Sequence, residues 1–253
     1  MVLGGPLVRP DESFDRDPGS YSVERALGLV AALALLSALS VVVIGAGVAH
    51  AIPDEATVEN PERPPASACD DESTVNLTVD GEPVTFATPE TCDEPARVPT
   101  DRLVWRAVGG ELPGQFFAPM LGWLLVGGVF HAVTRSDGES PAGPMTVAAW
   151  GRVSRVLGTL LLALVLAWTA AGSGVAPGTP TAEATIRTIG WAFEASVPLA
   201  IGVRTAAIGW GAWIEYHGLR RVRDLPPRRA LLVVGLVAGV SLVVSLWALL
   251  SVG

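Results

Sequence analysis

Long uncharged apolar segments are the feature of this sequence that most constrains its fold. Four runs of 23 to 27 residues carry no Asp, Glu or Arg, and a fifth run is interrupted by two charged residues. A helix needs roughly 20 apolar residues to cross a hydrocarbon core of about 30 Å. The sequence therefore predicts an all-α transmembrane helical bundle of about five spans. It excludes a soluble enzyme, a nucleic-acid-binding domain and a disordered chain.

The predicted spans divide the chain into a tail, one separate span and a four-span domain. The spans comprise residues 26–52, 112–134, 156–171, 189–214 and 230–253. Residues 1–25 form a polar tail, residues 53–111 form a large segment outside the membrane, and residues 112–253 form the four-span domain. Span four is the least clearly predicted of the five membrane spans, because it holds the charged residues Glu194 and Arg204. Pro198 predicts a kink or the end of a half-helix within it.

The distribution of arginine predicts the orientation of the spans, because cytoplasmic loops carry an excess of positive residues. Eleven arginines precede span one or lie in the loops after spans two and four, whereas five lie on the other side. We therefore predict a multi-pass cell-membrane protein with a cytoplasmic N-terminus and an extracellular C-terminus. A competing interpretation treats Ala49-His50-Ala51 as a signal-peptidase site, although the preceding apolar run is longer than that of a signal peptide.

The acidic segment at residues 53–111 is predicted to be extracellular and to contain a small β-hairpin. Its first part is rich in proline, which is typical of a stiff linker. Alternating sequences at 74–79 and 84–88 then flank the turn signal Asp80-Gly81. The segment either contacts an envelope partner or serves only as a hydrophilic loop.

Cys69 and Cys92, the only two cysteines, flank this hairpin. Paired strands would bring them together in a compartment where disulfides persist. We predict a Cys69–Cys92 disulfide, which would stabilise the small hairpin by around 3 kcal/mol. Two free thiols or a metal pair are the alternatives. Asn76 begins an N-glycosylation sequon on the same predicted outer face.

The charged residues indicate the environment of the protein. All 17 basic residues are Arg, and they are outnumbered by 25 acidic residues. Molar salt screens exposed charges to within a few Å, so an acidic surface is tolerated there. We predict that the protein comes from a halophilic archaeon. A GC-rich genome is an alternative reason for the absence of Lys.

The sequence carries no recognisable catalytic motif. It lacks a Gly-rich phosphate loop before a helix, a nucleophile elbow, and Cys or His motifs at zinc spacing. The three histidines, His50, His131 and His217, lie near span ends and are interpreted as interfacial polar residues. We therefore predict no enzymatic activity, no metal and no cofactor.

Small residues at four-residue spacing predict close helix packing. Gly235 and Gly239 form such a pair in span five, and Gly202 and Ala206 form another in span four. Packing within the bundle is the favoured interpretation, and a homo-oligomer through Gly235 and Gly239 is the alternative. The expected partners are membrane lipids and an unidentified membrane protein; nucleic acid is not expected.

Arg204 is a candidate intramembrane polar site together with Glu194. An Arg at mid-span costs about 2.5 to 3.5 kcal/mol on insertion scales. Glu194 cannot be its direct partner on one helix, because ten residues span about 15 Å. Arg204 is therefore predicted to snorkel, to meet carbonyls freed near Pro198, or to face a polar cleft that receives an anionic headgroup or a partner's carboxylate.

The later part of the chain carries short motifs in a defined order. They are Phe130-His131-Ala132-Val133-Thr134-Arg135, Asp137-Gly138-Glu139-Ser140, Thr146-Val147-Ala148-Ala149-Trp150-Gly151, Trp213-Ile214-Glu215-Tyr216-His217-Gly218-Leu219 and Pro227-Arg228-Arg229-Ala230-Leu231-Leu232. From about residue 113 to the end, this layout resembles the Yip1-domain family of multipass membrane proteins.

The resemblance implies a non-enzymatic scaffold that organises membranes or binds partners. Eukaryotic members of the family associate with small GTPases through cytoplasmic parts, and this is not carried over because the tail here is short. The alternative function is a transporter or channel component that uses Glu194 and Arg204. The absence of an internal repeat counts against transport. A sensor would lack a cytoplasmic output domain.

Overall fold

The computed structural model describes most of the chain. The described residues are 5–14, 21–52, 57–60, 77–79, 82–84, 92, 97–135, 139–172, 187, 190, 191 and 193–250. Cys69 and Asn76 lie outside this part of the chain, so the disulfide and the glycosylation site remain predictions. Cys92 lies inside it and is not a free thiol.

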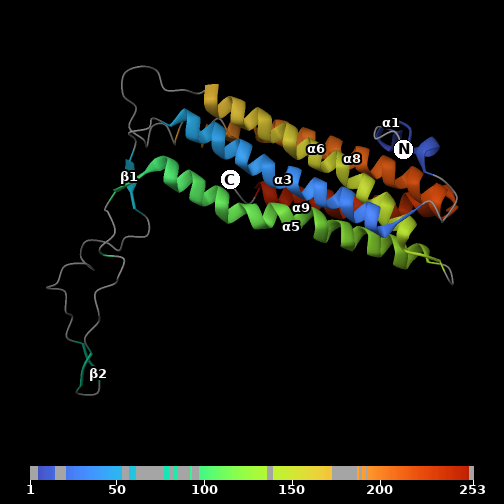
Figure 1. Cartoon of the computed structure of the whole chain (residues 1–253), viewed down its shortest axis with the longest axis horizontal. Helices are drawn as coiled ribbons and strands as arrows, with labels where there is room; N and C mark the ends of the chain where they lie inside the picture. Colours follow the sequence, from blue (N-terminus) through green and yellow to red (C-terminus); the bar gives the residue numbers. More distant parts are fainter. Residues whose placement is uncertain are drawn as a thin grey trace.

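Within the described residues, five long helices lie side by side and form the body of the molecule (Figure 1). They are α3 (Val23–Ala51), α5 (Thr100–Thr134), α6 (Ala142–Gly172), α8 (Val197–Val222) and α9 (Pro227–Leu250). Each is long and apolar enough to cross a membrane, which confirms the predicted five-helix architecture. Two short helices, α1 (Gly5–Val8) and α2 (Pro10–Ser13), lie at the end where α3 begins.

The helices extend beyond the apolar runs that predicted them. α5 begins at Thr100 rather than Leu112, and α6 begins at Ala142 rather than Val156. α8 begins at Val197 and continues to Val222, so it is displaced toward the C-terminus relative to residues 189–214. The physical reason is that a hydropathy run measures the stretch suited to lipid. A helix can continue through polar residues because its backbone hydrogen bonds are internal.

Local signals explain where several helices begin and end. The Ser22 side chain accepts a hydrogen bond from the Arg25 backbone N–H at the start of α3. Pro198 lies in the first turn of α8, where its missing N–H has no intrahelical partner to lose. It therefore opens the continuous helix and does not kink it. The turn between α8 and α9 has Asp224 in the left-handed region, with φ of 47°.

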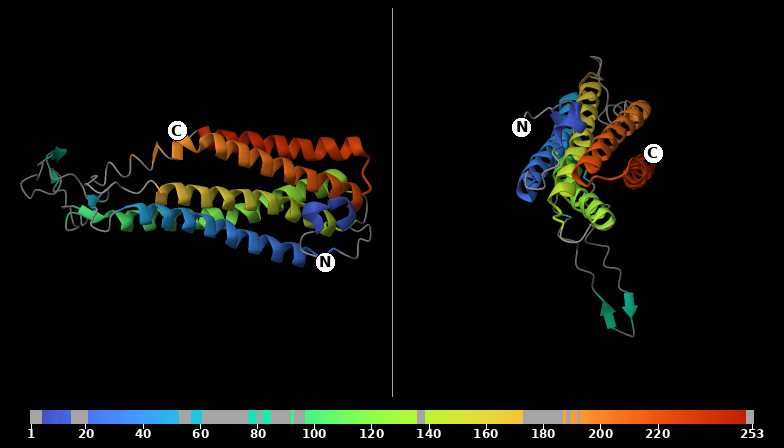
Figure 2. Two further views of the ribbon diagram at one scale, coloured as in Figure 1. Left: turned by 90° about the horizontal axis from the view of Figure 1, so that it is seen from above. Right: turned by 90° about the vertical axis from the view of Figure 1, so that its right-hand side faces the viewer.

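The central helix of the bundle is α6, which packs against α3, α5 and α8. The last helix, α9, packs mainly on α8 and is set to one side of the bundle in the end-on view (Figure 2). The α6–α8 contact is close because glycines face each other. A Cβ on Gly211 would lie 2.7 Å from the Gly151 carbonyl oxygen.

The small residues of α9 do not serve this kind of packing. A Cβ on Gly235 or Gly239 would meet nothing within 4 Å, and the same holds for Gly202 in α8. The interpretation that Gly235 and Gly239 pack within the bundle was therefore wrong for the described part of the chain. Their face of α9 points outward.

The largest buried cluster lies at the end of the bundle where α5 turns into α6 and α8 turns into α9. Phe130, Val147, Ile214 and Leu219 are fully buried there. Trp123 is buried in the same cluster, and its Nε1 donates to the Met145 carbonyl oxygen at 2.8 Å. Phe14, just after α2, also packs into it. The N-terminal segment is therefore anchored to the bundle.

In the described part of the segment before α5, there are four short strands. β2 (Leu77–Val79) pairs antiparallel with β3 (Glu82–Val84), and β1 (Thr57–Glu59) pairs antiparallel with β4 (Arg97–Pro99). The returning strand β3 begins two residues earlier than the predicted 84–88. The β1–β4 pair was not predicted. It joins the segments next to α3 and α5, and the Arg97 guanidinium donates to the Thr57 side chain and carbonyl.

Candidate functional site

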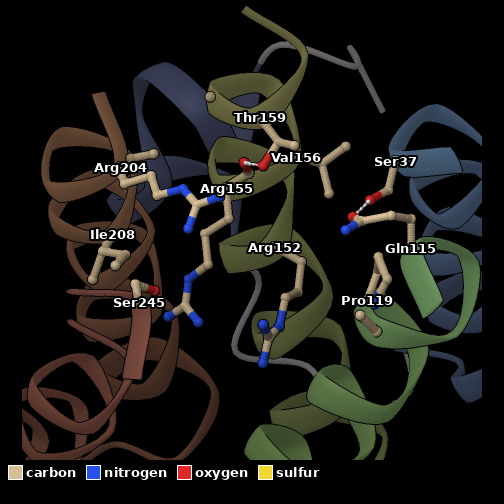
Figure 3. A pocket seen from close by; sticks show the side chains of 13 residues that line it. Ser37, Gln115, Pro119, Arg152, Arg155, Val156, Thr159, Arg204, Ile208 and Ser245 are labelled. Atoms are coloured by element: carbon tan, nitrogen blue, oxygen red, sulfur yellow. Dashed lines mark hydrogen bonds between the residues drawn. The ribbon is translucent and has the colours of Figure 1, made fainter. Parts of the chain in front are cut away.

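A cavity of about 290 Å³ lies among the five long helices. Residues from all five helices line it: Ser37, Gln115, Ala118, Pro119, Arg152, Arg155, Val156, Gly158, Thr159, Arg204, Ala207, Ile208 and Ser245. Figure 3 shows Arg204 extending from α8 toward α6, while Arg152 and Arg155 extend from α6. Three arginines from two helices therefore share one site, which lies within five membrane-spanning segments.

The cavity lies away from both ends of the bundle. Ser37 is in the middle of α3, and Arg155 lies about 20 Å along α6 from Ala142. Ser245 and Arg204 also lie inside their helices rather than in the connecting turns. These side chains therefore lie within the helices that are long and apolar enough to cross a membrane, and not in the turns that connect them.

Gly122 allows the Arg152 side chain of α6 to pack closely against α5. Its Nη2 donates to the Gly122 carbonyl oxygen at 2.6 Å. A Cβ on Gly122 would lie 2.6 Å from the same nitrogen, so only glycine leaves room for the guanidinium at this distance. The Nε of Arg152 has no hydrogen-bond partner among the described residues.

Arg155 connects α6 with both α8 and α9. Its Nη1 donates to Ser241 Oγ at 3.3 Å, and its Nη2 lies 3.6 Å from Glu215 Oε1. The Glu215 side chain is completely buried. Within the described part of the chain, neither carboxylate oxygen accepts a hydrogen bond. The ion pair is thus the interaction that offsets the cost of burying this carboxylate.

Gly151 makes the buried position of Glu215 possible. A Cβ on Gly151 would lie 2.6 Å from Glu215 Cγ and would also collide with Oε1. Ser154, on the same face of α6, donates to the Ala207 carbonyl oxygen at 2.9 Å. The α6 sequence Gly151-Arg152-Val153-Ser154-Arg155 therefore supplies the close helix contact and two of the three cavity arginines.

Arg204 lines the cavity and is partly buried. No ion pair or hydrogen bond connects its side chain to another described residue. The three predicted explanations for Arg204 therefore stay predictions, and the structure adds that its side chain lines a cavity shared with two other arginines. Glu194 does not join it: this residue precedes α8 and is exposed.

The site carries an excess of positive charge. Three guanidinium groups and one carboxylate, that of Glu215, leave two positive charges uncompensated when all four groups are ionised. Burying such charge without a partner is costly in a low-dielectric environment. The excess of guanidinium groups is therefore suited to holding an anion. A guanidinium can bind a phosphate or carboxylate in bidentate fashion.

Sequence reasoning identified Arg204 but missed Arg152, Arg155 and Glu215. Arg152 and Arg155 precede an uninterrupted apolar run and are predicted to lie in a cytoplasmic loop, whereas Glu215 follows the predicted end of span four. The spacing of Arg152 and Arg155 was an available signal, since residues three apart lie on one helix face. It indicates a site only when the helix is known to begin at Ala142.

A second polar cluster joins the two turns at one end of the bundle. Arg223 forms an ion pair with Glu139, and its Nη2 lies 3.2 Å from His131 Nδ1. The same nitrogen donates to the Ser140 carbonyl oxygen at 2.9 Å. These contacts connect segments that are far apart in the sequence and that belong to the motifs around residues 130–140 and 213–229.

Comparison with known proteins gives a family but no close relative. The family model described as the Yip1 domain matches residues 5–249. The match is wider than the resemblance from about residue 113 onward and includes α1, α2, α3 and the segment before α5. Comparisons with curated proteins and with solved structures found no match. The match over nearly the whole chain shows that this multipass helical protein belongs to the Yip1 domain family.

Proposed function

We propose that this chain is a non-enzymatic membrane protein that binds an anionic group inside its helical bundle. The observation that supports this proposal is the cavity shared by Arg152, Arg155 and Arg204, where three guanidiniums outnumber the one carboxylate beside them. A bound anion would offset the remaining charge and accept hydrogen bonds from nitrogens that have no partner among the described residues.

The test is anion binding by the purified full chain in a neutral detergent. Inorganic phosphate is titrated while the thermal unfolding midpoint is recorded, because a ligand that binds the native state raises this midpoint. Arg204→Gln should reduce the apparent affinity about tenfold, the loss expected for one charge-assisted hydrogen bond. Arg228→Gln removes an exposed arginine in the first turn of α9 and is the matched control. An equal response of all three proteins would contradict the proposal.

A second candidate function is partner binding through α9. Gly235 and Gly239 leave an open strip on the outer face of this helix, where a neighbouring helix could approach closely. Such a contact is consistent with a scaffold that assembles as a homo-oligomer or with another membrane protein. Cross-linking in native membranes should then capture an oligomer, and replacing both glycines with Leu should abolish it. Gly128→Leu, on an open position of α5, is the control.

We further propose that the protein resides in the cell membrane of a halophile. Arg152 and Arg155 lie inside the bundle, which leaves nine arginines on the side of the N-terminus against five on the other. This remaining bias supports a cytoplasmic N-terminus and an extracellular C-terminus. The excess of acidic residues outside the spans supports a high-salt environment, because screening by salt reduces their repulsion. The purified protein should lose stability when KCl is lowered from molar to tenth-molar concentrations. Equal stability in both would contradict the halophilic assignment.

A further inference from the structure

An apolar groove between α5 and α9 opens directly beside the arginines. It has a volume of about 490 Å³. Leu125 and Val129 of α5 form one wall, and Val240 and Val244 of α9 form the other. Arg152 and Arg155 line this groove and also the arginine cavity. The groove and the arginine cavity therefore share part of their lining.

The groove faces the lateral surface of the bundle. The side chains of Leu125, Val240 and Val244 are each more than half exposed. The groove exists because α9 packs mainly on α8 and makes little contact with α5. Figure 2 shows the same arrangement end-on, with α9 set apart from the other helices. In a membrane, lipid chains can reach this surface.

We propose that the ligand of the arginine cavity is an anionic membrane lipid. Its phosphate would lie among Arg152, Arg155 and Arg204, and one acyl chain would lie in the groove between α5 and α9. This inference rests on the anion-binding function proposed above and adds the chemical class of the ligand and its route of entry.

Two features favour a lipid over a free inorganic anion. Charge complementarity requires an anion, because three guanidiniums exceed the single Glu215 carboxylate. The valine and leucine walls require an apolar group, and a free phosphate would leave them unmatched. An amphiphile with an anionic head and a hydrocarbon tail satisfies both requirements at once.

Two serines of α9 lie where the proposed lipid would join its anionic headgroup to its acyl chains. Ser241 and Ser245 are one turn apart within the apolar part of α9 that follows Arg229, and both line the groove. Ser241 Oγ already accepts a hydrogen bond from Arg155. Ser245 also lines the arginine cavity. The transition from polar to apolar surface thus occurs within one turn of α9.

The experiment compares lipid and free phosphate on the purified full chain in a neutral detergent. The probes are dioctanoyl phosphatidylglycerol, dioctanoyl phosphatidylcholine and inorganic phosphate, and binding is measured by thermal shift and by native mass spectrometry. Val244→Trp is designed to fill the groove. Val243→Trp is the matched control, because Val243 is the adjacent exposed residue of α9 and does not line the groove.

We expect phosphatidylglycerol to bind more tightly than phosphatidylcholine, and Arg204→Gln to weaken phosphatidylglycerol binding about tenfold. Val244→Trp should weaken phosphatidylglycerol binding about tenfold more than it weakens phosphate binding, whereas Val243→Trp should bind like the wild type.

Each other result overturns a defined part of the proposal. If phosphate binds through Arg204 but Val244→Trp and Val243→Trp bind phosphatidylglycerol equally, the lipid inference is wrong and the anion site stands. Equal affinity for phosphatidylglycerol and phosphatidylcholine would also contradict the proposal that the ligand is an anionic lipid. If neither phosphate nor phosphatidylglycerol depends on Arg204, both the inference and the proposed function fail.

Discussion

The carboxylate of Glu215 lies 3.6 Å from the Arg155 guanidinium, and its side chain is completely buried in the bundle. This pair connects α8 to α6 beside the arginine cavity. Removing one member of a buried ion pair is costly, because the remaining charge is left without compensation.

Glu215→Gln should therefore lower the free energy of unfolding by about 3 kcal/mol. The double variant Glu215→Gln/Arg155→Gln should recover part of this loss, since both charges are then absent. Thermal or denaturant unfolding in detergent provides the measurement. Glu194→Gln, which changes an exposed residue before α8, is the control and should have no effect. A Glu215→Gln protein as stable as the wild type would show that the pair does not stabilise the fold.

Gly151→Ala should destabilise the protein by about 1 to 3 kcal/mol through overpacking. The added methyl group would collide with the Glu215 carboxylate, and the close contact between α6 and α8 leaves little room to adjust. Gly128→Ala adds the same methyl group where nothing lies within 4 Å. That control should be neutral or slightly stabilising, because alanine favours a helix. Similar midpoints for both variants would contradict the packing argument.

Arg223→Met should loosen the end of the bundle where the two turns meet. It removes the ion pair with Glu139 and the hydrogen bond to Ser140, and the Arg223 side chain is only 5% exposed. We expect faster proteolysis of the α5–α6 turn in detergent, together with a lower unfolding midpoint. Arg228→Met is the control, because Arg228 is exposed in the first turn of α9. Unchanged proteolysis of Arg223→Met would mean that the cluster does not hold the turn.

The orientation of the spans can be measured with single-cysteine probes in a chain whose native cysteines are replaced by serine. A membrane-impermeant thiol reagent added to whole cells should label a cysteine at Gly253 and should not label one at Ser136. The expected result follows from the arginine bias. The opposite labelling pattern would reverse the topology. Labelling of both positions after cell lysis is the control for probe accessibility.

Cys69 and Cys92 should resist alkylation in the unfolded protein until a reductant is added. The expected disulfide closes the segment that contains β2 and β3, and an isolated pair of short strands is only marginally stable in water. Mass spectrometry after alkylation, with and without prior reduction, measures this. Alkylation of both thiols without reductant would contradict the predicted Cys69–Cys92 disulfide.

Several parts of this architecture followed from the sequence alone. The five apolar runs predicted five helices because each span must satisfy its backbone internally and match the thickness of the membrane. The ordered motifs predicted the family that the wider match then showed. Arg204 was identified as a candidate because it breaks an otherwise apolar run.

Only the tertiary structure decided which charged residues meet inside the bundle. Arg152 and Arg155 precede the apolar run of span three and Glu215 follows span four, so hydropathy places all three outside the membrane-spanning segments. Their burial depends on α6 beginning at Ala142 and on Gly151 allowing α8 to approach. Likewise, Gly235 and Gly239 carry the same pattern as packed glycines, yet they face outward. The physical reason is that a one-dimensional pattern describes a single helix. The burial and pairing of a charge depend on what the neighbouring helices place beside it.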